Sequence, residues 1–329
     1  MASAVAARSD AILYLSEADL GRLALDPAEV LAAVEEGLQR DGADVVVVPK
    51  LNLPIAIGHF LQAMTAASRS LGMAAIKWTA VVAANADRGL PNVTALIVVS
   101  ALEDGRPLAI MAGNRITALR TAAMTAAAAR RLARPESETV SFIGTGVQAA
   151  SHLTALRVLF PRLTRAYLFG RGAASRERLA AAARAHGIEP VAVRQARDAI
   201  EPADVIITSV PAMPGLAPFI DGAWLKPGAF ASMVDLGRSW RAETLGVIDV
   251  VATDDRAQSD AIAAEGKLVR CGPWAADLAD LVCGRHPGRS APTQRAAFIF
   301  AGIARCDLAV AAVALQRARA ERVGAWLPR

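Results

Sequence analysis

The sequence predicts an α/β protein with two parts, an α+β domain and a domain in which strands and helices alternate. Three observations support this prediction. The chain has 329 residues, which is long enough for two domains. Residues 45–100 contain short β-favouring segments separated by turn residues, as in a largely antiparallel sheet. After Pro135, β-branched segments alternate with Ala-rich segments of helical length, which indicates parallel β–α–β units.

The first part begins with helical periodicity and continues with strands. Ser16–Arg40 reads as helical, with Asp26 as an N-cap and Pro27 at the first helical position. Glu103–Pro107 is a turn signal between two apolar runs and predicts a hairpin. The strands expected here are Val45–Val48, His59–Thr65, Met73–Val82 and Val93–Ser100.

An Ala-rich helix, Ile116–Leu132, should lead into the second part, because Pro135 stops it and two arginines suit its C-terminal dipole. The tail Pro292–Arg319 reads as one or two helices. We therefore expect one domain from residues 1–120 with 292–329, and a second from 121–291. The second domain's strands should be Thr139–Ile143, Arg165–Phe169, Val191–Val193, Ala203–Val210, Gly228–Leu236 and Val247–Ala252, and its first helices Val147–Phe160 and Ala173–His186.

Composition argues against several classes of protein. The net charge is +5, but the 36 basic residues form no dense run, so a nucleic-acid partner is not expected. The spacing of Cys271, Cys283 and Cys306 fits no metal site or disulfide framework, and the four histidines show no metal-ligand spacing. Residues 1–10 do not resemble a signal peptide, and no apolar run reaches the ~18 residues of a membrane span. We expect a cytoplasmic protein without a metal or a membrane partner.

A glycine-rich segment, Ser141–Ala149, reads as the phosphate-binding turn of a Rossmann domain. It follows a β-branched strand and opens a helical segment. Gly144 permits a tight turn, Gly146 lets the backbone approach a pyrophosphate, and Ala149 allows close packing of helix on strand. The alternative is a structural turn that binds no nucleotide. The predicted cofactor contacts in this turn are Gly144, Thr145, Gly146, Val147 and Gln148.

The end of the second strand predicts which dinucleotide is bound. NAD enzymes usually carry an acidic residue there, whereas this chain has Phe169-Gly170-Arg171, with Arg176 a helical turn further on. Arg171 and Arg176 can pair with a 2′-phosphate, so NADPH is predicted in preference to NADH. The alternative is that both arginines are simply solvated. Cofactor contacts are also predicted for three residues near the ends of later strands, Thr208, Ser209 and Val234.

Two basic residues stand out in the first part. Lys77, one of only four lysines, lies inside an apolar β-favouring segment, where a charge is costly unless it is paired or binds an anion. Arg120 lies near the start of the Ala-rich helix. Both can hold a substrate carboxylate. The alternatives are an ammonium that reaches solvent and a charge on the helix surface.

Several segments together resemble the ornithine cyclodeaminase/mu-crystallin family, in the same order and from about Ser16 to Arg319. They are Lys77-Trp78, Gly89-Leu90-Pro91-Asn92-Val93, Ile116-Thr117-Ala118-Leu119-Arg120-Thr121-Ala122-Ala123 and Gly144-Thr145-Gly146-Val147-Gln148-Ala149.

The resemblance implies a homodimer with a substrate cleft between the dimerisation layer and the Rossmann domain. It implies that Lys77, Arg120 and a basic residue near Lys50 hold the substrate carboxylate. Gln62 matches a position that is acidic in the cyclodeaminases. Asn92 matches a polar residue near the nicotinamide, and Arg120 is also an expected cofactor contact.

One departure bears on the chemistry. Ornithine cyclodeaminases carry an essential Asp after the fifth Rossmann strand, and the ungapped match here is Gly237, with Asp235 two residues earlier. Either Asp235 replaces the missing carboxylate or the cyclodeaminase reaction is absent. Gln62 also lacks the negative charge that would suit a diamino acid.

The leading hypothesis is an NADPH-dependent reductase in amino-acid metabolism that converts a cyclic imino acid, of the Δ1-pyrroline-2-carboxylate or Δ1-piperideine-2-carboxylate type, to a cyclic amino acid. Lys77 and Asp235 are the predicted catalytic residues: Lys77 orients the carboxylate and Asp235, or a water it orients, protonates nitrogen. The alternative for Asp235 is a turn cap. The alternative functions are an amino-acid cyclodeaminase, an alanine or N-alkyl amino-acid dehydrogenase, and a non-catalytic NADPH-binding protein.

Overall fold

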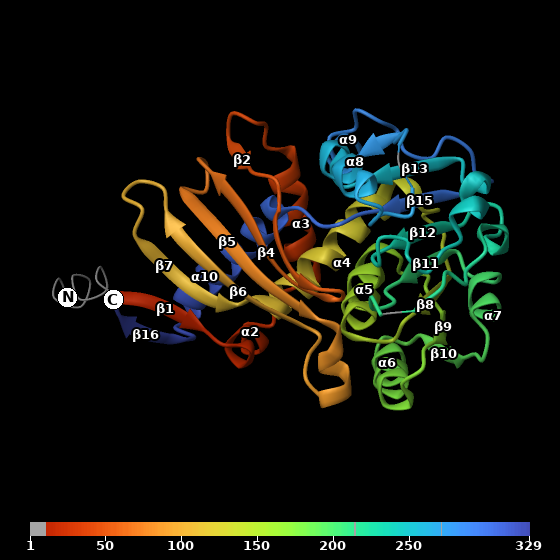
Figure 1. The fold of residues 1–329 in the computed structure, drawn as a ribbon, viewed down its shortest axis with the longest axis horizontal. Coiled ribbons are helices and arrows are strands. Elements are labelled where there is room, and N and C mark those ends of the chain that lie inside the picture. Colours follow the sequence, from red (N-terminus) through yellow and green to blue (C-terminus); the bar gives the residue numbers. More distant parts are fainter. Residues whose placement is uncertain (1–10, 214, 271) are drawn as a thin grey trace. The chain divides into compact units, whose positions relative to one another are not determined.

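The computed structural model describes residues 11–213, 215–270 and 272–329, which form two compact units (Figure 1). The first unit contains the described chain up to Arg120 and again from Ile303 onward, and the second contains Thr121–Gly302. Cys271 and residues 1–10 lie outside the described residues. The expected fold class, a Rossmann domain plus an α+β domain, is confirmed.

The first unit is built on an eight-stranded sheet in the order β16-β1-β7-β6-β5-β4-β2, with β3 also paired to β4. Every pairing is antiparallel except that of β1 with β7. The strands are β1 (Ala11–Leu15), β2 (Val45–Val47), β3 (Leu51–Ala56), β4 (His59–Ser68), β5 (Met73–Val82), β6 (Val93–Ala101), β7 (Pro107–Ala112) and β16 (Ala325–Pro328).

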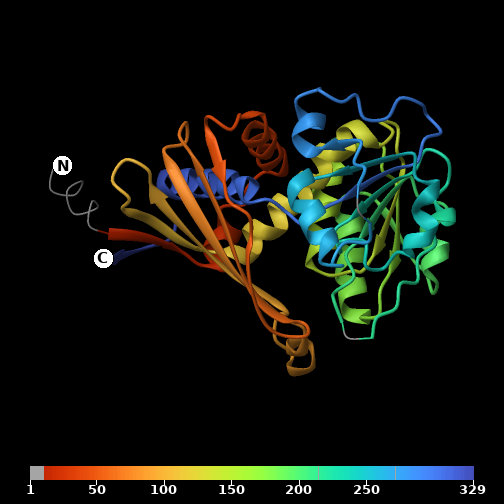
Figure 2. The same cartoon turned by 45° about the horizontal axis from the view of Figure 1, so that its top comes forward.

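Helices cover one face of this sheet. α10 (Ala304–Glu321) packs against β4 and β5, and α3 (Pro27–Gln39) packs against α10 (Figure 2). The segment expected to be one helix is two, because α2 (Glu17–Arg22) ends before Asp26 caps α3. The 3-10 helix η1 (Ala83–Arg88) joins β5 to β6.

Three strands of the first unit were not predicted. β3 contains Pro54 and is exposed along its whole length, so it lacks the alternation that marks a half-buried strand. β1 and β16 pair with each other although they lie at opposite ends of the sequence, so no local sequence pattern could predict that pairing.

The second unit contains a wholly parallel sheet in the order β10-β9-β8-β11-β12-β15-β13-β14. Its first five strands have the spatial order of the Rossmann fold. From β8 the chain adds β9 and β10 on one side, and then returns to add β11 and β12 on the other side of β8. The strands are β8 (Thr139–Ile143), β9 (Arg165–Phe169), β10 (Glu189–Ala192), β11 (Val205–Thr208), β12 (Phe230–Met233), β13 (Val250–Thr253), β14 (Ala276–Asp277) and β15 (Ala296–Ile299).

Helices connect these strands in the manner expected of β–α–β units. α4 (Gly113–Leu132) begins in the first unit and ends in the second. The other helical elements of the second unit are α5 (Val147–Leu159), α6 (Ala173–Ala185), α7 (Ala196–Ile200), α8 (Arg256–Ala264), α9 (Leu278–Val282) and the 3-10 helices η2 (Gly222–Trp224) and η3 (Ala242–Val247).

The expected helical tail from Pro292 is wrong in its first part. Ala296–Ile299 is a fully buried strand, β15, inserted between β12 and β13, and only α10 is helical. A buried apolar run of four residues has no periodicity that separates strand from helix. Because β15 lies inside the parallel sheet, the second unit extends to Gly302, beyond the expected boundary at residue 291.

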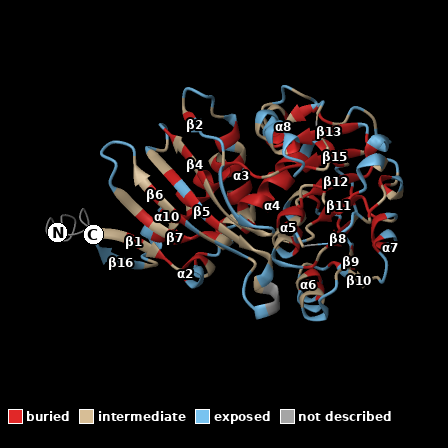
Figure 3. Cartoon of the chain, viewed as in Figure 1, coloured by how far each residue is buried: buried red, intermediate tan, exposed pale blue. Residues whose placement is uncertain are grey.

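Burial differs between the two sheets. The inner strands β11, β12, β13 and β15 of the second sheet are buried on both faces, as strands of parallel sheets generally are (Figure 3). Strands inside the first sheet show more alternation between buried and less buried residues. In β5, for example, Lys77 is buried and its neighbours Ile76 and Trp78 are exposed. Among the described residues, no helix is both long enough and apolar enough to cross a bilayer.

Candidate functional site

The glycine-rich turn joins β8 to α5. Gly144 has a left-handed backbone (φ +98°), and a Cβ there would lie 2.8 Å from the carbonyl oxygen of Ser209. Its N–H donates to the carbonyl of Phe169 at 2.9 Å. Ser209 Oγ donates to the carbonyl oxygen of Gly144 at 3.4 Å. These contacts fix the turn beside the carboxyl ends of β9 and β11, and they explain why this position requires glycine.

The N-terminus of α5 fits a dinucleotide's pyrophosphate. Gly146 is its N-cap, and among the described residues no side chain caps the helix and nothing lies within 4 Å of a Cβ built on Gly146. Val147 is exposed, and the buried Oε1 of Gln148 has no hydrogen-bond partner in the described part of the chain. Uncapped N–H groups that face open space bind an anion well. Thr145 is buried instead, with Oγ1 3.0 Å from Ser175 Oγ, so it ties the turn to α6.

The loop after β9 is basic. Arg171 is exposed, and its Nη2 lies 2.8 Å from Met213 Sδ. Arg176 is half-buried and donates from Nη1 to the carbonyl oxygen of Gly170 at 2.7 Å, which braces the loop. No acidic residue occurs from Phe169 to Arg176. The loop therefore offers a ribose 2′-substituent a cation and no carboxylate.

Asp235 follows β12 and is buried, which raises the pKa of its carboxyl group although hydrogen bonds and Arg238 oppose the shift. Its oxygens accept from Thr208 Oγ1 at 2.9 Å and Ser239 Oγ at 2.6 Å. They also accept from the backbone N–H groups of Gly237 at 3.1 Å and Val210 at 3.4 Å. Two of these donors belong to the turn after β12 and two to the end of β11, so Asp235 joins the carboxyl ends of two neighbouring strands.

Two further predicted cofactor residues lie in the same region. The side chain of Thr208 is buried and bonded to Asp235 and to the indole N–H of Trp240, which donates at 3.2 Å. Val234 is half-buried. Of the predicted contacts near the later strand ends, Ser209 lies beside the glycine turn and Thr208 belongs to the Asp235 network.

Gly237 cannot be replaced by an acidic residue without strain. Its backbone is left-handed (φ +73°), and a Cβ would lie 2.7 Å from Cβ of Val269. Both features oppose a side chain at this position. The backbone of this turn therefore does not suit the carboxylate that the family pattern places here.

In the first unit, two predicted basic residues meet on one acidic residue. Lys77 Nζ lies 2.8 Å and Arg120 Nε 3.0 Å from the same oxygen, Oδ1 of Asp307. The three residues come from β5, α4 and α10. They are only 2%, 5% and 2% exposed, respectively. Lys50, half-buried just before β3, acts on the same cluster because its charge lowers the pKa of Asp307. We call Lys77, Arg120 and Asp307 the buried triad.

The triad's charges are set by competing effects. Burial, followed by the charge of Arg120, lowers the pKa of Lys77 to about 8, and the attraction of Asp307 only partly opposes this. Burial would raise the pKa of Asp307, but the charges of Arg120 and Lys77 outweigh it and hold this pKa below its usual value. The carboxylate is therefore ionised at neutral pH, and Lys77 loses its proton in mildly alkaline solution.

The comparisons with known proteins identify the family of this chain. The model of the ornithine cyclodeaminase/mu-crystallin family matches residues 15–322. This chain belongs to that family. The predicted resemblance is confirmed.

Three known proteins match nearly the whole chain. Alanine dehydrogenase of Archaeoglobus fulgidus is 29% identical over 310 residues, 90% of this chain and 92% of the relative. The structure of Thermococcus litoralis Δ1-pyrroline-2-carboxylate reductase with NADH and L-proline has a TM-score of 0.86 at 27% identity, covering 95% of this chain and 99% of that one. An archaeal alanine dehydrogenase dimer with bound NAD has a TM-score of 0.84 at 27% identity, covering 96% and 99%.

Two residues that the family pattern singled out lie apart from the triad's ion pairs. Gln62 is on β4, on the same face of the sheet as Lys77, and its Nε2 donates to Asn52 Oδ1 at 2.7 Å. Asn92 lies just before β6, at the far end of the β5–β6 ladder, where its carbonyl accepts from Val82 N–H.

Asp307 was not predicted from the sequence. It lies in the apolar helical segment Cys306-Asp307-Leu308-Ala309-Val310, and a lone acid inside such a segment was the available signal. Its partners are 230 and 187 residues away, so no local pattern could have matched it to Lys77 and Arg120.

Proposed function

We propose that this chain is an NADPH-dependent reductase of a cyclic imino acid, of the Δ1-pyrroline-2-carboxylate or Δ1-piperideine-2-carboxylate type, that forms a cyclic amino acid. Its broader class, an NAD(P)-dependent oxidoreductase acting on CH–NH or C=N bonds, follows from its family and from relatives named as dehydrogenases and reductases. The observation that carries the finer proposal is the pair of buried cations, Lys77 and Arg120, held on one oxygen of the first unit.

The proposed substrate carboxylate binds to this pair. Buried cations are stabilised by nearby anions, and the buried triad itself contains two cations and one carboxylate. A planar carboxylate with two oxygens matches an ammonium and a guanidinium that lie side by side. Lys77 and Arg120 would thereby fix the orientation of the imine carbon, and Lys50 would add positive charge at the same place.

The proposed cofactor binds to the second unit. Its pyrophosphate would lie on the N-terminus of α5 at Gly146, beside the turn at Gly144. When bound, the nicotinamide supplies a hydride to the imine carbon. Arg171 and Arg176 would receive the 2′-phosphate of NADPH, because the loop after β9 contains cations and no acid.

Lys77 is the proposed acid, because both oxygens of Asp235 accept hydrogen bonds from the ends of β11 and β12. A pKa of about 8 allows this ammonium to release a proton near neutral pH, which suits general acid catalysis. The same group would bind the carboxylate, so its charge serves both orientation and proton supply.

Two features disfavour the cyclodeaminase alternative. Gly237 leaves no room for the family's acidic residue, and Gln62 is neutral and bonded to Asn52. A diamino acid would bring a second ammonium group to a region that contains Lys50, Lys77 and Arg120. Alanine dehydrogenase activity remains the second candidate, because a relative of that name matches 90% of the chain.

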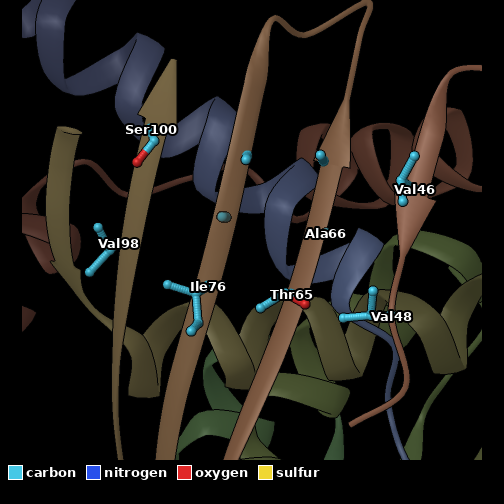
Figure 4. A pocket seen from close by; sticks show the side chains of 10 residues that line it. Val46, Val48, Thr65, Ala66, Ile76, Val98 and Ser100 are labelled. Atoms are coloured by element: carbon cyan, nitrogen blue, oxygen red, sulfur yellow. The ribbon is translucent and has the colours of Figure 1, made fainter. Parts of the chain in front are cut away.

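A homodimer is part of the proposal. The first sheet is covered by α10 on one face, and its other face exposes apolar side chains, including Ile76 (38% exposed) and Trp78 (42% exposed). A pocket of about 290 Å³ is lined in part by Val48, Thr65, Ile76 and Val98, whose side chains Figure 4 shows. Apolar faces of this kind usually mark protein contacts. A second copy of the chain is the proposed partner, as in the archaeal alanine dehydrogenase dimer.

The test is oxidation of NADPH by the purified protein with Δ1-pyrroline-2-carboxylate and Δ1-piperideine-2-carboxylate, beside pyruvate with ammonia or methylamine. Reduction of a cyclic imine with the highest kcat/KM supports the proposal. A higher kcat/KM with pyruvate and ammonia favours the alanine dehydrogenase alternative. Ammonia release from ornithine without net NADPH oxidation would contradict both.

A further inference from the structure

Asp307 brings the two proposed carboxylate-binding cations together. Lys77 and Arg120 come from β5 and α4, and each places a nitrogen on Asp307 Oδ1. We propose that Asp307 is a positioning residue, which holds Lys77 and Arg120 side by side as a single carboxylate-binding pair. This inference rests on the proposed function, because it assigns a role to a residue beside the proposed substrate carboxylate.

Charge repulsion makes such a residue necessary. Both nitrogens bind one oxygen, so they lie within about 6 Å of each other, and two positive charges this close repel strongly in a buried environment. An anion between them removes the repulsion and fixes both side chains. With Asp307 ionised, the buried triad has a net charge of +1, which one substrate carboxylate neutralises.

The remaining oxygen of Asp307 supports a role through charge. Oδ2 is buried and has no hydrogen-bond partner among the described residues. By contrast, the buried carboxylate of Asp204 binds the backbone N–H groups of Glu138 and Thr139, and thereby also holds strand ends in place. Burying a carboxylate oxygen without a hydrogen-bond partner lowers stability. The contribution of Asp307 must therefore come from the two cations that its other oxygen binds.

The surroundings of Lys77 leave few other groups to set its proton affinity. Its neighbours across the sheet are Met64 on β4 and Ile97 on β6, which carry no charge. α4 contributes Arg120, which opposes the charge of Lys77. α10 contributes Asp307 and Cys306, which both favour it. Removing the charge of Asp307 should therefore make Lys77 lose its proton at a lower pH.

The experiment measures binding of pyrrole-2-carboxylate, an unreactive planar carboxylate that stays a monoanion from pH 6 to pH 9, to the full-length protein with NADP+. Asp307→Asn should weaken binding at least tenfold at pH 7. As the pH is raised, the affinity of this variant should begin to fall at a lower pH than that of the wild type. Asp307→Glu keeps the charge and should lie closer to the wild type in both respects.

A second arm separates positioning from packing. If Asp307 acts through Lys77, Asp307→Asn should weaken binding strongly in the wild type and much less in the Lys77→Met variant. Asp204→Asn is the matched control, because Asp204 likewise pairs with an arginine and a lysine, Arg134 and Lys226. It should lower stability and leave the affinity and its pH dependence unchanged.

The outcomes also separate this inference from the proposed function. Binding of the probe that depends on Asp307, with no imine reduced, would retain the inference and reject the function. Wild-type affinity and pH dependence in Asp307→Asn would overturn the inference. If Asp307→Asn and Asp307→Glu lose the same affinity, and the loss is unchanged in the Lys77→Met variant, the inference is overturned. Asp307 would then act only by packing in the core. If the wild type does not bind the probe at any pH, both are rejected.

Discussion

The proposal uses Gly237 to disfavour the cyclodeaminase reaction, and the structure predicts what a side chain there would cost. In Gly237→Ala, the left-handed backbone (φ +73°) costs about 1–2 kcal/mol for a residue with a Cβ. The new Cβ would lie 2.7 Å from Cβ of Val269, and such overpacking typically costs about 1–3 kcal/mol. The free energy of unfolding should therefore fall by about 2–5 kcal/mol.

Urea unfolding followed by circular dichroism measures this change. Gly237→Ala should lower the free energy of unfolding less in a Val269→Ala background, because the steric clash is then relieved and only the backbone strain remains. Gly146→Ala is the control: its backbone is not left-handed and its Cβ would meet open space, so stability should change by no more than about 1 kcal/mol. Full stability of Gly237→Ala, or ammonia release from ornithine by Gly237→Asp, would refute the reasoning.

Four other perturbations test separate parts of the account. Since Lys77 has a pKa of about 8, carboxylate affinity should fall by up to about tenfold per pH unit above 8, and Lys77→Met should abolish this dependence; an unchanged profile would contradict it. Arg171→Asp should weaken NADPH binding by about 10–100-fold and NADH binding little, measured by fluorescence titration; equal losses would exclude a contact with the 2′-phosphate. Asp235→Asn should lower the free energy of unfolding by about 1–3 kcal/mol, with kcat nearly unchanged at low temperature, whereas a large loss of kcat would restore it as the acid. Ile76→Asp should convert a dimer to monomers in sedimentation, and a persistent dimer would place the interface elsewhere.

Local patterns in the sequence predicted most of the fold. The β–α–β alternation and the glycine turn specify the Rossmann unit from β8 to β12, because each parallel strand and its helix are adjacent in the chain. β15 was missed since its insertion between β12 and β13 depends on tertiary packing, and a four-residue apolar run does not reveal it. β1 and β16 were missed because only the folded chain brings them together.

The candidate site was predictable in its residues but not in its connections. A lysine inside an apolar strand and an arginine in an apolar helix were visible as unusual charges, and Lys77 and Arg120 do meet. Asp307 was invisible, because pairing across about two hundred residues leaves no spacing to read. Asp235 was assigned to chemistry from its position after a strand, whereas the structure surrounds it with hydrogen-bond donors from its own turn and from the end of β11.

The most direct test of the central claim is the rate of NADPH oxidation with Δ1-pyrroline-2-carboxylate, measured beside NADH and in an Arg120→Met variant. We predict turnover to proline, a higher kcat/KM with NADPH than with NADH, and a rise in the KM for the imine of at least tenfold in the variant. Turnover that does not depend on Arg120, or no reduction of any cyclic imine, would contradict the account.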